Sequence, residues 1–275
     1  DYYTKELGYY KPNLNEQNKN LKYKIKNFLK NQTLVNHFNY PLFKKNFLFF
    51  CLTLPFKRWL KVAGFPQYKN NGLVLDIGCS HGEFLEELKN LGWLAWGIEM
   101  DKDVACYAQN KRGINIENKP IEACDFEKQK FDAITMRMVL EHLYSPFEIL
   151  KKISLWQKPK GELIFSIPYF WGFEFRVFKS NTYALQLPHH IIFFKKAVIK
   201  SYLKKIGYKK IRFYHYYKTK EFTSSAQIKY KETGKKIYYF LAVNKIARIF
   251  LTPFIFLLSL FNFTGRVTVY AKKND

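Results

Sequence analysis

The residues whose types could do chemistry begin in a short turn at residues 76–82. An apolar run ends in the carboxylate Asp76, and small residues follow at alternate positions, namely Gly78, Ser80 and Gly82. Glycine tolerates positive φ and allows backbone to approach a ligand closely, and a helix that starts after such a turn offers unpaired N–H groups. An acid at a strand end followed by a turn without bulky side chains predicts a site for a nucleoside with free hydroxyl groups.

A second carboxylate, Glu99, ends the next apolar stretch of the chain. An acid at this position accepts hydrogen bonds from ribose hydroxyls in dinucleotide-binding folds. The spacing Gly78-x-Ser80-x-Gly82 differs, however, from the G-x-G-x-x-G of pyrophosphate binders. It also spells the nucleophile elbow of α/β-hydrolases, with Ser80 as nucleophile, but an elbow has no use for Asp76 or Glu99. A strand–helix junction that binds no ligand is the remaining alternative.

These residues must be positioned by alternating strands and helices, which the hydrophobic pattern predicts from residue 72 onward. The expected strands are 72–77, 93–99, 114–117, 131–136, 161–167, 210–216 and 266–272, and the expected helices are 81–90, 101–111, 145–156 and 195–206. Strands separated by helices at this spacing favour βαβ units. We therefore expect an α/β fold with a doubly wound, Rossmann-like, seven-stranded parallel sheet. Its ligands should lie outside the carboxyl ends of the strands.

The order of the motifs resembles one known family. Asp76-x-Gly78-x-Ser80-x-Gly82 together with Glu99 looks like the first two motifs of the class I S-adenosylmethionine-dependent methyltransferases. The pattern continues with Gly92-Trp93, Phe131–Thr135, Val139–Leu143, Pro146, Lys158–Gly161, Pro188–His190 and Phe194. It is similar to a bacterial group that methylates small molecules and glycans, and the likeness covers roughly residues 70–216.

The resemblance implies S-adenosylmethionine as the cofactor and gives each site residue a role. Glu99 would hold the ribose, Asp76 and the glycine turn would face the amino-acid part, Met100 would pack on adenine, Ile121 would lie near the adenine ring, and Met136 and Arg137 would lie beside the sulfonium. Ser80 departs from the family, which usually has glycine there. We expect Ser80 to fit if its φ stays negative, with its hydroxyl bonding the cofactor carboxylate.

Two histidines are candidate catalytic bases. His142 follows the fourth strand and His190 lies on a loop after the fifth, and an imidazole can accept the proton of an acceptor hydroxyl near neutral pH. The alternatives are that His142 caps the loop or shapes the pocket, and that His190 contacts phosphate or fixes its loop. Some related methyltransferases bind a divalent metal through a Glu-x-x-Glu-His pattern. Because Met138 stands at the first of these positions, we expect no metal.

Charge and hydropathy bear on the partners. The 275 residues contain 46 Lys and Arg against 22 Asp and Glu, a net charge of +24, which favours nucleic acid, anionic lipid or a phosphorylated substrate. An uncharged run at 249–265 is interrupted by Pro253 and precedes the last strand, and Lys235, Lys236, Lys245 and Arg248 stand before it. Because the chain then returns to the sheet, we expect an interfacial or re-entrant helical hairpin. A buried helical cap or a dimer interface is the alternative.

Three regions follow from this pattern. We expect an N-terminal helical extension at 1–69, a methyltransferase domain at 70–217 plus 266–275, and an apolar, membrane-facing helical insertion at 218–265. The four cysteines form no CxxC pair and no zinc module, which fits a reducing compartment. With no signal-peptide pattern at the start of the sequence, we expect a cytoplasmic protein, peripheral on the inner face of the membrane.

The sequence therefore predicts a methyltransferase that acts by direct displacement on a small-molecule, sugar or lipid-linked glycan acceptor, at a hydroxyl and near the membrane surface. An RNA or protein methyltransferase is one alternative, favoured by the net charge. A non-catalytic, membrane-associated scaffold that keeps a nucleoside pocket is the other. The sequence does not indicate the oligomeric state.

Overall fold

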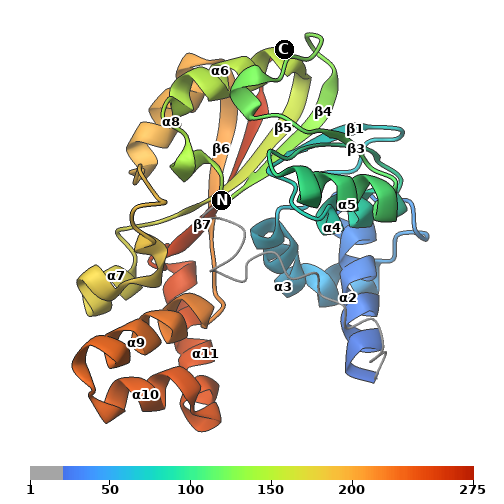
Figure 1. Ribbon diagram of the computed structural model, residues 1–275. Coiled ribbons are helices and arrows are strands. Elements are labelled where there is room, and N and C mark those ends of the chain that lie inside the picture. The colour runs from blue at the N-terminus through green and yellow to red at the C-terminus, as the bar shows by residue number, and fades with distance from the viewer. Residues whose placement is uncertain (1–20) are drawn as a thin grey trace. The chain divides into compact units, whose positions relative to one another are not determined.

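The computed structural model describes residues 21–275, which contain one seven-stranded sheet and ten α-helices (Figure 1). The strands are β1 Leu73–Ile77, β2 Leu94–Ile98, β3 Asn115–Glu117, β4 Phe131–Arg137, β5 Gln157–Pro168, β6 Tyr208–His215 and β7 Arg266–Lys273. The helices are α2 Leu21–Phe38, α3 Phe47–Ala63, α4 Glu83–Asn90, α5 Lys102–Arg112, α6 Pro146–Trp156, α7 Phe173–Phe178, α8 Lys196–Lys205, α9 Lys220–Thr233, α10 Lys236–Val243 and α11 Lys245–Leu260.

The strand order is β3-β2-β1-β4-β5-β7-β6. It confirms the predicted α/β class and the seven strands. The sheet is not entirely parallel, however, because β7 pairs antiparallel with β6. The last strand inserts between β5 and β6 instead of adding to an edge, and the strand-period pattern of the sequence carries no information on which neighbour a strand takes.

β1 is a central strand, and its position fixes the turn that follows it. It pairs in parallel with β2 on one side and with β4 on the other, so that Asp76 lies opposite Gly97 and Thr135. Val74, Leu75 and Ile77 are almost completely buried. A strand flanked on both sides and covered on both faces reads as a continuous apolar run, and its carboxyl end is where such sheets place a ligand.

The chain divides into two compact units. The first comprises the described residues up to Leu60 with Phe65–Met136 and Leu155–Glu162, and the second comprises Lys61–Gly64, Arg137–Ser154 and Leu163–Asp275. The first unit thus holds β1–β3 with α2, α4 and α5, and the second holds β6, β7 and α6–α11 apart from the end of α6. The three predicted sequence regions remain a proposal about organisation.

In the first unit, α2 packs against the domain through its second half. The helix is longer than the predicted stretch near residues 20–30, whose first residue lies outside the described part, and its buried residues run from Gln32 to Phe38. Lys30 Nζ lies 2.6 Å from Glu87 Oε1 of α4, and Trp93 Nε1 donates to the hydroxyl of Tyr40 at 3.0 Å. The second half of α2 is therefore part of the core of this unit.

In the second unit, α7, α9, α10 and α11 form a helical group beyond one end of β6 and β7 (Figure 1). Their shared core contains Phe178, Phe222, Ala226, Ala242 and Ile255. No single helix within residues 21–275 is long and apolar enough to cross a membrane, whereas α10 and α11, bent by 75° at their junction, pass that test of length and composition together.

One buried carboxylate lies at the base of this helical group. Glu174 of α7 is 1% exposed, its Oε2 has no hydrogen-bond partner in the described part of the chain, and the backbone of Gly265 approaches it so closely that a Cβ there would lie 3.2 Å from that oxygen. Burial, aided by the nearby Glu221 carboxylate, raises the pKa of Glu174 to about 7. Between pH 4.5 and about 7 this shift favours a proton on Glu174 in the folded protein and a released proton in the unfolded chain.

This proton makes stability depend on pH in a defined direction. Because the folded-state pKa is raised, the native state binds more protons than the unfolded state between pH 4.5 and about 7, and stability falls as pH rises through that window. Glu174→Gln removes this titration, so its unfolding free energy should not fall with that of wild type. The difference between variant and wild type should therefore shift by up to about 3 kcal/mol in favour of the variant as pH rises from ~5 to ~8. Urea denaturation at both pH values measures it.

The control is Glu148→Gln on α6, which makes the same change on a side chain that is 65% exposed. Its unfolding free energy should follow that of wild type at both pH values. If Glu174→Gln also tracks wild type across the window, the buried proton at Glu174 does not exist.

Candidate active site

The turn after β1 places three alternate residues in the left-handed region. The φ angles are 69° at Gly78, 50° at Ser80 and 75° at Gly82. The two glycines confirm the expectation of positive φ. The condition set for Ser80, a negative φ, is not met: the serine occupies a conformation that costs a residue with a Cβ roughly 1–2 kcal/mol. Its hydroxyl lies 3.3 Å from His81 Nδ1, so it bonds within the turn.

Gly82 is required by packing as well as by its φ. A Cβ at this position would lie 2.8 Å from Ile114 Cδ1 and 3.1 Å from Ala108 of α5. The absence of a side chain therefore lets the start of α4 press against α5. Gly82 therefore acts as a helix-packing glycine.

Glu99 is the polar centre of the first unit. Its side chain is 5% exposed, and its two carboxylate oxygens accept hydrogen bonds at 3.0 Å from the backbone N–H groups of Ser80 and Asp101. Its own carbonyl accepts from Asn118 Nδ2 at 2.9 Å. A carboxylate oxygen can accept more than one bond, so Glu99 keeps acceptor capacity for a diol. The donor set of a ribose fits this residue.

Asp76 is fixed by a residue of the neighbouring strand. Thr135 Oγ1 of β4 donates to Asp76 Oδ1 at 2.6 Å, and both side chains are buried. The register that sets these residues opposite each other explains the pair. The Thr135 hydroxyl thus fixes the position of the carboxylate.

The other predicted cofactor residues differ in exposure. Met100 is 72% exposed, just beyond β2, while Ile121 is buried and Met136 is completely buried. Arg137 is exposed at the end of β4. The side chains of Met100 and Arg137 are therefore open to a ligand, whereas those of Ile121 and Met136 pack in the interior and offer mainly their backbone.

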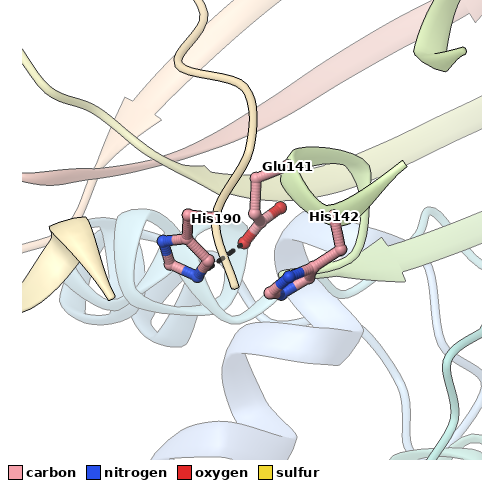
Figure 2. Close-up of side chains that lie close together, drawn as sticks. All are labelled: Glu141, His142 and His190. Carbon is pink, nitrogen blue, oxygen red and sulfur yellow. Dashed lines mark ion pairs between the residues drawn. The ribbon is translucent and has the colours of Figure 1, made fainter. Parts of the chain in front are cut away.

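The predicted bases lie together with a carboxylate in the second unit (Figure 2). Glu141 Oε1 lies 3.9 Å from His190 Nε2, and the rings of His142 and His190 are 4.8 Å apart between centroids. His142 Nδ1 is 2.8 Å from the carbonyl of His189, and His190 Nδ1 is 2.7 Å from that of Ala184. The loop that carries His190 is thus tied to the short 3₁₀ turn Leu140–His142.

Burial disfavours charge on every member of this cluster. It raises the pKa of Glu141 and lowers the pKa values of His142 and His190, and the charge of Arg266 acts on both Glu141 and His190 in the downward direction. A neutral imidazole beside an uncharged carboxyl is not an ion pair. The 3.9 Å contact between Glu141 and His190 therefore joins two neutral groups in the protein alone. Either a proton on Glu141 or a bound cation neutralises the carboxylate.

Sequence reasoning missed the partners that hold these side chains. Thr135 lies inside a motif quoted for the resemblance, and its place opposite Asp76 follows once the strand register is known. Asn118 and the backbone of Asp101 carry no signal of their own. Glu141 stands beside His142 in the sequence, but its convergence with His190 depends on a loop that no periodicity describes.

Comparison with known proteins settles the family. A family profile described as a methyltransferase domain matches residues 54–212, more than half of the chain. This chain belongs to that methyltransferase family. The match includes the turn at 76–82, Glu99 and the Glu141-His142 pair, so the predicted motifs lie inside the recognised domain. It is an S-adenosylmethionine-dependent methyltransferase domain, and the roles of the turn and Glu99 in binding that cofactor stay predictions.

Sequence relatives and solved structures agree on this domain. A ubiquinone biosynthesis O-methyltransferase from Coxiella burnetii is 34% identical over 98 residues, which cover 34% of this chain and 42% of the relative. The chain thus spans less than half the length of the curated relatives it matches. A SAM-dependent methyltransferase from Archaeoglobus fulgidus has a similar fold, with a TM-score of 0.53, 17% identity, and coverage of 92% of this chain and all of that one. Phosphoethanolamine N-methyltransferase 2 from Haemonchus contortus, solved with S-adenosyl-L-methionine, has a TM-score of 0.51 at 15% identity. The match covers 80% of this chain and 52% of that one.

The methyltransferase should lose cofactor affinity when Glu99 is removed. Glu99→Ala deletes charged acceptors that contribute about 1.5–3 kcal/mol each, so the Kd for S-adenosylmethionine should rise by at least about 10-fold. Isothermal titration calorimetry measures it. Glu117→Ala, at the end of the neighbouring strand β3, serves as the control and should bind like wild type. Equal affinity in wild type and Glu99→Ala would remove Glu99 from the cofactor site.

Proposed function

We propose that this methyltransferase transfers a methyl group to a hydroxyl of a sugar, nucleotide-sugar or lipid-linked glycan at the surface of a membrane. The observation that carries the proposal lies in the helical group. Its helices α10 and α11 expose large apolar side chains beside basic residues. The name of the Coxiella relative, an O-methyltransferase, supports oxygen as the methylated atom.

The chemistry follows from the domain. S-adenosylmethionine supplies an electrophilic methyl group when bound; the acceptor oxygen forms a bond to its carbon as the carbon–sulfur bond breaks, and the electron pair of that bond stays on sulfur. Glu99 and Asp76 would hold and orient the cofactor, so that alignment of the reactants contributes to the rate. The hydroxyl must lose its proton in the step, and His142 and His190 stay the predicted proton acceptors.

The exposed face of α11 supports contact with lipid. Ile249 and Phe250 are 68% and 72% exposed, and Phe261, just after the helix, is 74% exposed. Further exposed large apolar residues of α10 and α11 are Ile237, Tyr239, Phe240, Val243, Ile246, Phe254, Phe256, Leu257 and Leu260. A patch of this kind on a soluble protein marks an interaction surface. Lys235, Lys236 and Lys245 at the starts of the two helices suit anionic headgroups.

A cleft of about 570 Å³ in the same helical group supports a phosphorylated acceptor. Its walls carry three cations, Lys218, Lys220 and Arg248, together with hydroxyl side chains that include Thr219 and Thr252. Ammonium and guanidinium groups with hydroxyls are the donors that recognise phosphate. The phosphate or pyrophosphate of a lipid-linked saccharide fits this lining better than an uncharged acceptor.

A second apolar surface occurs on α3 in the first unit. Phe47, Leu48, Leu52 and Leu54 are more than half exposed, and Lys44, Lys45 and Lys57 stand close to them in the sequence. The combination of exposed apolar side chains with lysines repeats the composition of α10 and α11. A membrane surface accounts for both segments with one partner.

Substitutions on α11 test membrane binding. The double variant Ile249→Asp/Phe250→Asp replaces two exposed apolar side chains, each worth about 1.5–3 kcal/mol when buried, and adds charges that anionic lipid repels. Its partition onto phosphatidylglycerol-containing vesicles should fall at least about 10-fold in a flotation assay. Tyr144→Asp, on a residue that is 89% exposed outside the helical group, should bind vesicles like wild type. Unchanged flotation of the double variant would refute the membrane proposal.

An RNA acceptor is the alternative with an observation in its favour, the net charge of +24. Such a charge binds phosphate backbones without sequence preference, and that binding weakens steeply with salt. The basic residues named above, however, border apolar segments instead of forming a stripe on a polar face. This placement favours a membrane surface over RNA.

Methyl transfer to separate acceptor fractions distinguishes these functions. With labelled S-adenosylmethionine, we expect label in lipid-linked or nucleotide-sugar fractions of a bacterial extract, as a base-stable methyl ether, and none above background in RNA or protein. Glu99→Ala should abolish the label. Labelling of RNA that falls steeply with salt would establish the alternative, and wild-type protein that binds the cofactor but labels no fraction would support the non-catalytic scaffold.

A further inference from the structure

Glu141 is a buried carboxylate that lacks a hydrogen-bond partner among the described residues. Its side chain is completely buried, and neither carboxylate oxygen has a hydrogen-bond partner in the part of the chain that the structure describes. Buried polar groups in folded proteins are almost always paired, and an exception calls for an ion or a proton that satisfies it. An unpaired buried charge costs several kcal/mol, so something must neutralise Glu141.

Two imidazoles converge on this carboxylate (Figure 2). One ligand atom from each of Glu141, His142 and His190 can be chosen so that all three lie within 4.8 Å of one another. Glu141 and His190 are buried and His142 is half-buried. The three side chains come from two segments, the 3₁₀ turn Leu140–His142 and the loop before α8.

The hydrogen bonds of the two histidines fix which nitrogen can act as a ligand. Each Nδ1 lies within 2.8 Å of a backbone carbonyl, that of His189 for His142 and that of Ala184 for His190. A carbonyl only accepts, so each Nδ1 carries the proton, and each Nε2 carries a lone pair. Metal-binding histidines show this arrangement, in which the second ring nitrogen donates to a backbone carbonyl and holds the ring in place.

We propose that Glu141, His142 and His190 bind a divalent transition-metal ion. Two imidazole nitrogens and one carboxylate oxygen suit Zn²⁺, Fe²⁺ or Co²⁺, whereas Mg²⁺ and Ca²⁺ favour sites made of oxygen alone. The ion satisfies the two carboxylate oxygens and supplies the positive charge that the burial of Glu141 requires. Bonds of about 2.0–2.2 Å draw the three ligand atoms closer together than they lie in the protein alone.

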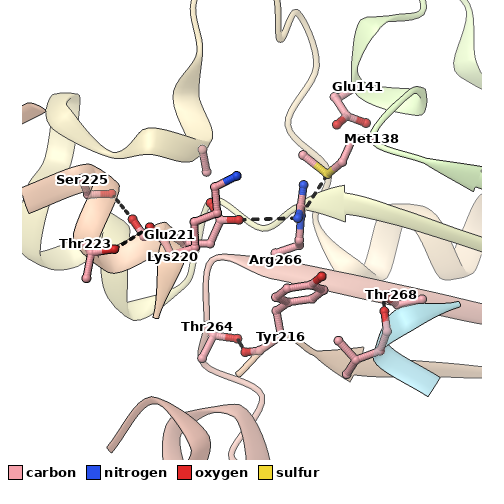
Figure 3. A network of polar contacts seen from close by, with 12 residues as sticks. Met138, Glu141, Tyr216, Lys220, Glu221, Thr223, Ser225, Thr264, Arg266 and Thr268 are labelled. Carbon is pink, nitrogen blue, oxygen red and sulfur yellow. Dashed lines mark hydrogen bonds and ion pairs between the residues drawn. The ribbon is translucent and has the colours of Figure 1, made fainter. Parts of the chain in front are cut away.

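This site differs from the Glu-x-x-Glu-His pattern that Met138 interrupts. Met138 does not take part: its sulfur accepts a hydrogen bond from Arg266 Nε at 3.2 Å, and Arg266 Nη1 lies 3.6 Å from Glu221 Oε1 (Figure 3). Arg266 is the nearby cation that would oppose a metal ion, and Glu221 offsets its charge. The third ligand comes instead from the loop, through His190.

Three protein ligands leave coordination positions open for an oxygen donor. A hydroxyl bound there would release its proton to solvent water more readily beside the ion, and the histidines would then act as ligands instead of proton acceptors. This last step rests on the proposed function. Metal binding is measured without cofactor or acceptor, so a failure of the proposed function and a failure of the metal site are distinguishable.

The test uses the full chain, stripped with a chelator and titrated with Co²⁺. Wild type should bind one ion, seen as visible d–d absorption that Zn²⁺ then displaces, and Zn²⁺ should raise Tm. Glu141→Gln and His190→Gln each remove one ligand while keeping a side chain of similar size. Each should weaken binding by at least about 100-fold, beyond the loss typical of residues that only support a ligand.

The control is His189→Gln, which removes a neighbouring imidazole that is not part of the cluster and should bind Co²⁺ like wild type. Circular dichroism and Tm of the metal-free proteins establish that each variant is folded. The proposal is overturned if wild type takes up neither ion when each is supplied in excess, which would mean that a proton satisfies Glu141. It is also overturned if the folded Glu141→Gln and His190→Gln variants bind as tightly as wild type.

Discussion

The first unit depends on the carboxylate of Glu99. One oxygen holds the N–H of Ser80 in the turn after β1, the other holds the N–H of Asp101 at the start of α5, and the backbone carbonyl holds the amide of Asn118 after β3. Bonds to a charged acceptor are the stronger ones in proteins. A single residue thus joins the turn after β1 to segments that follow β2 and β3. These bonds hold the candidate site in one arrangement in the absence of a ligand, and such preorganisation is what catalysis by alignment requires.

The same constraint explains why the turn tolerates so little side-chain volume. Gly78, Ser80 and Gly82 all have positive φ because the chain must turn tightly enough to bring the Ser80 amide to Glu99. Gly97 contributes from β2: a Cβ there would lie 2.5 Å from Cys79 Sγ and 2.7 Å from Ile116. The absence of a side chain at Gly97 therefore allows Cys79 of the turn to pack against β2. The strain at Ser80 is offset by the charged hydrogen bond that its own N–H makes.

Sequence reasoning recovered the features that local pattern encodes. Buried strands such as Leu73–Ile77 and the acid at the end of β2 follow from hydrophobicity and residue type. The sign of φ at Ser80 did not follow, because the Ser80 N–H bonds to Glu99, which follows another strand. The place of β7 between β5 and β6 and the approach of His190 to Glu141 depend on tertiary contacts, which a periodic pattern does not contain. The bond between Thr135 and Asp76 needed only the strand register.

The second unit departs from the usual distribution of polar and apolar groups. It buries the carboxyl groups of Glu141 and Glu174, each with at least one oxygen that has no partner among the described residues, while Ile249 and Phe250 of α11 are mostly exposed. Each departure costs free energy in the isolated chain, the first through lost hydration and the second through apolar surface left in water. A proton or a metal ion removes the first cost, and a lipid surface removes the second. These two departures are the physical reasons for proposing an ion at Glu141 and a lipid surface at α11.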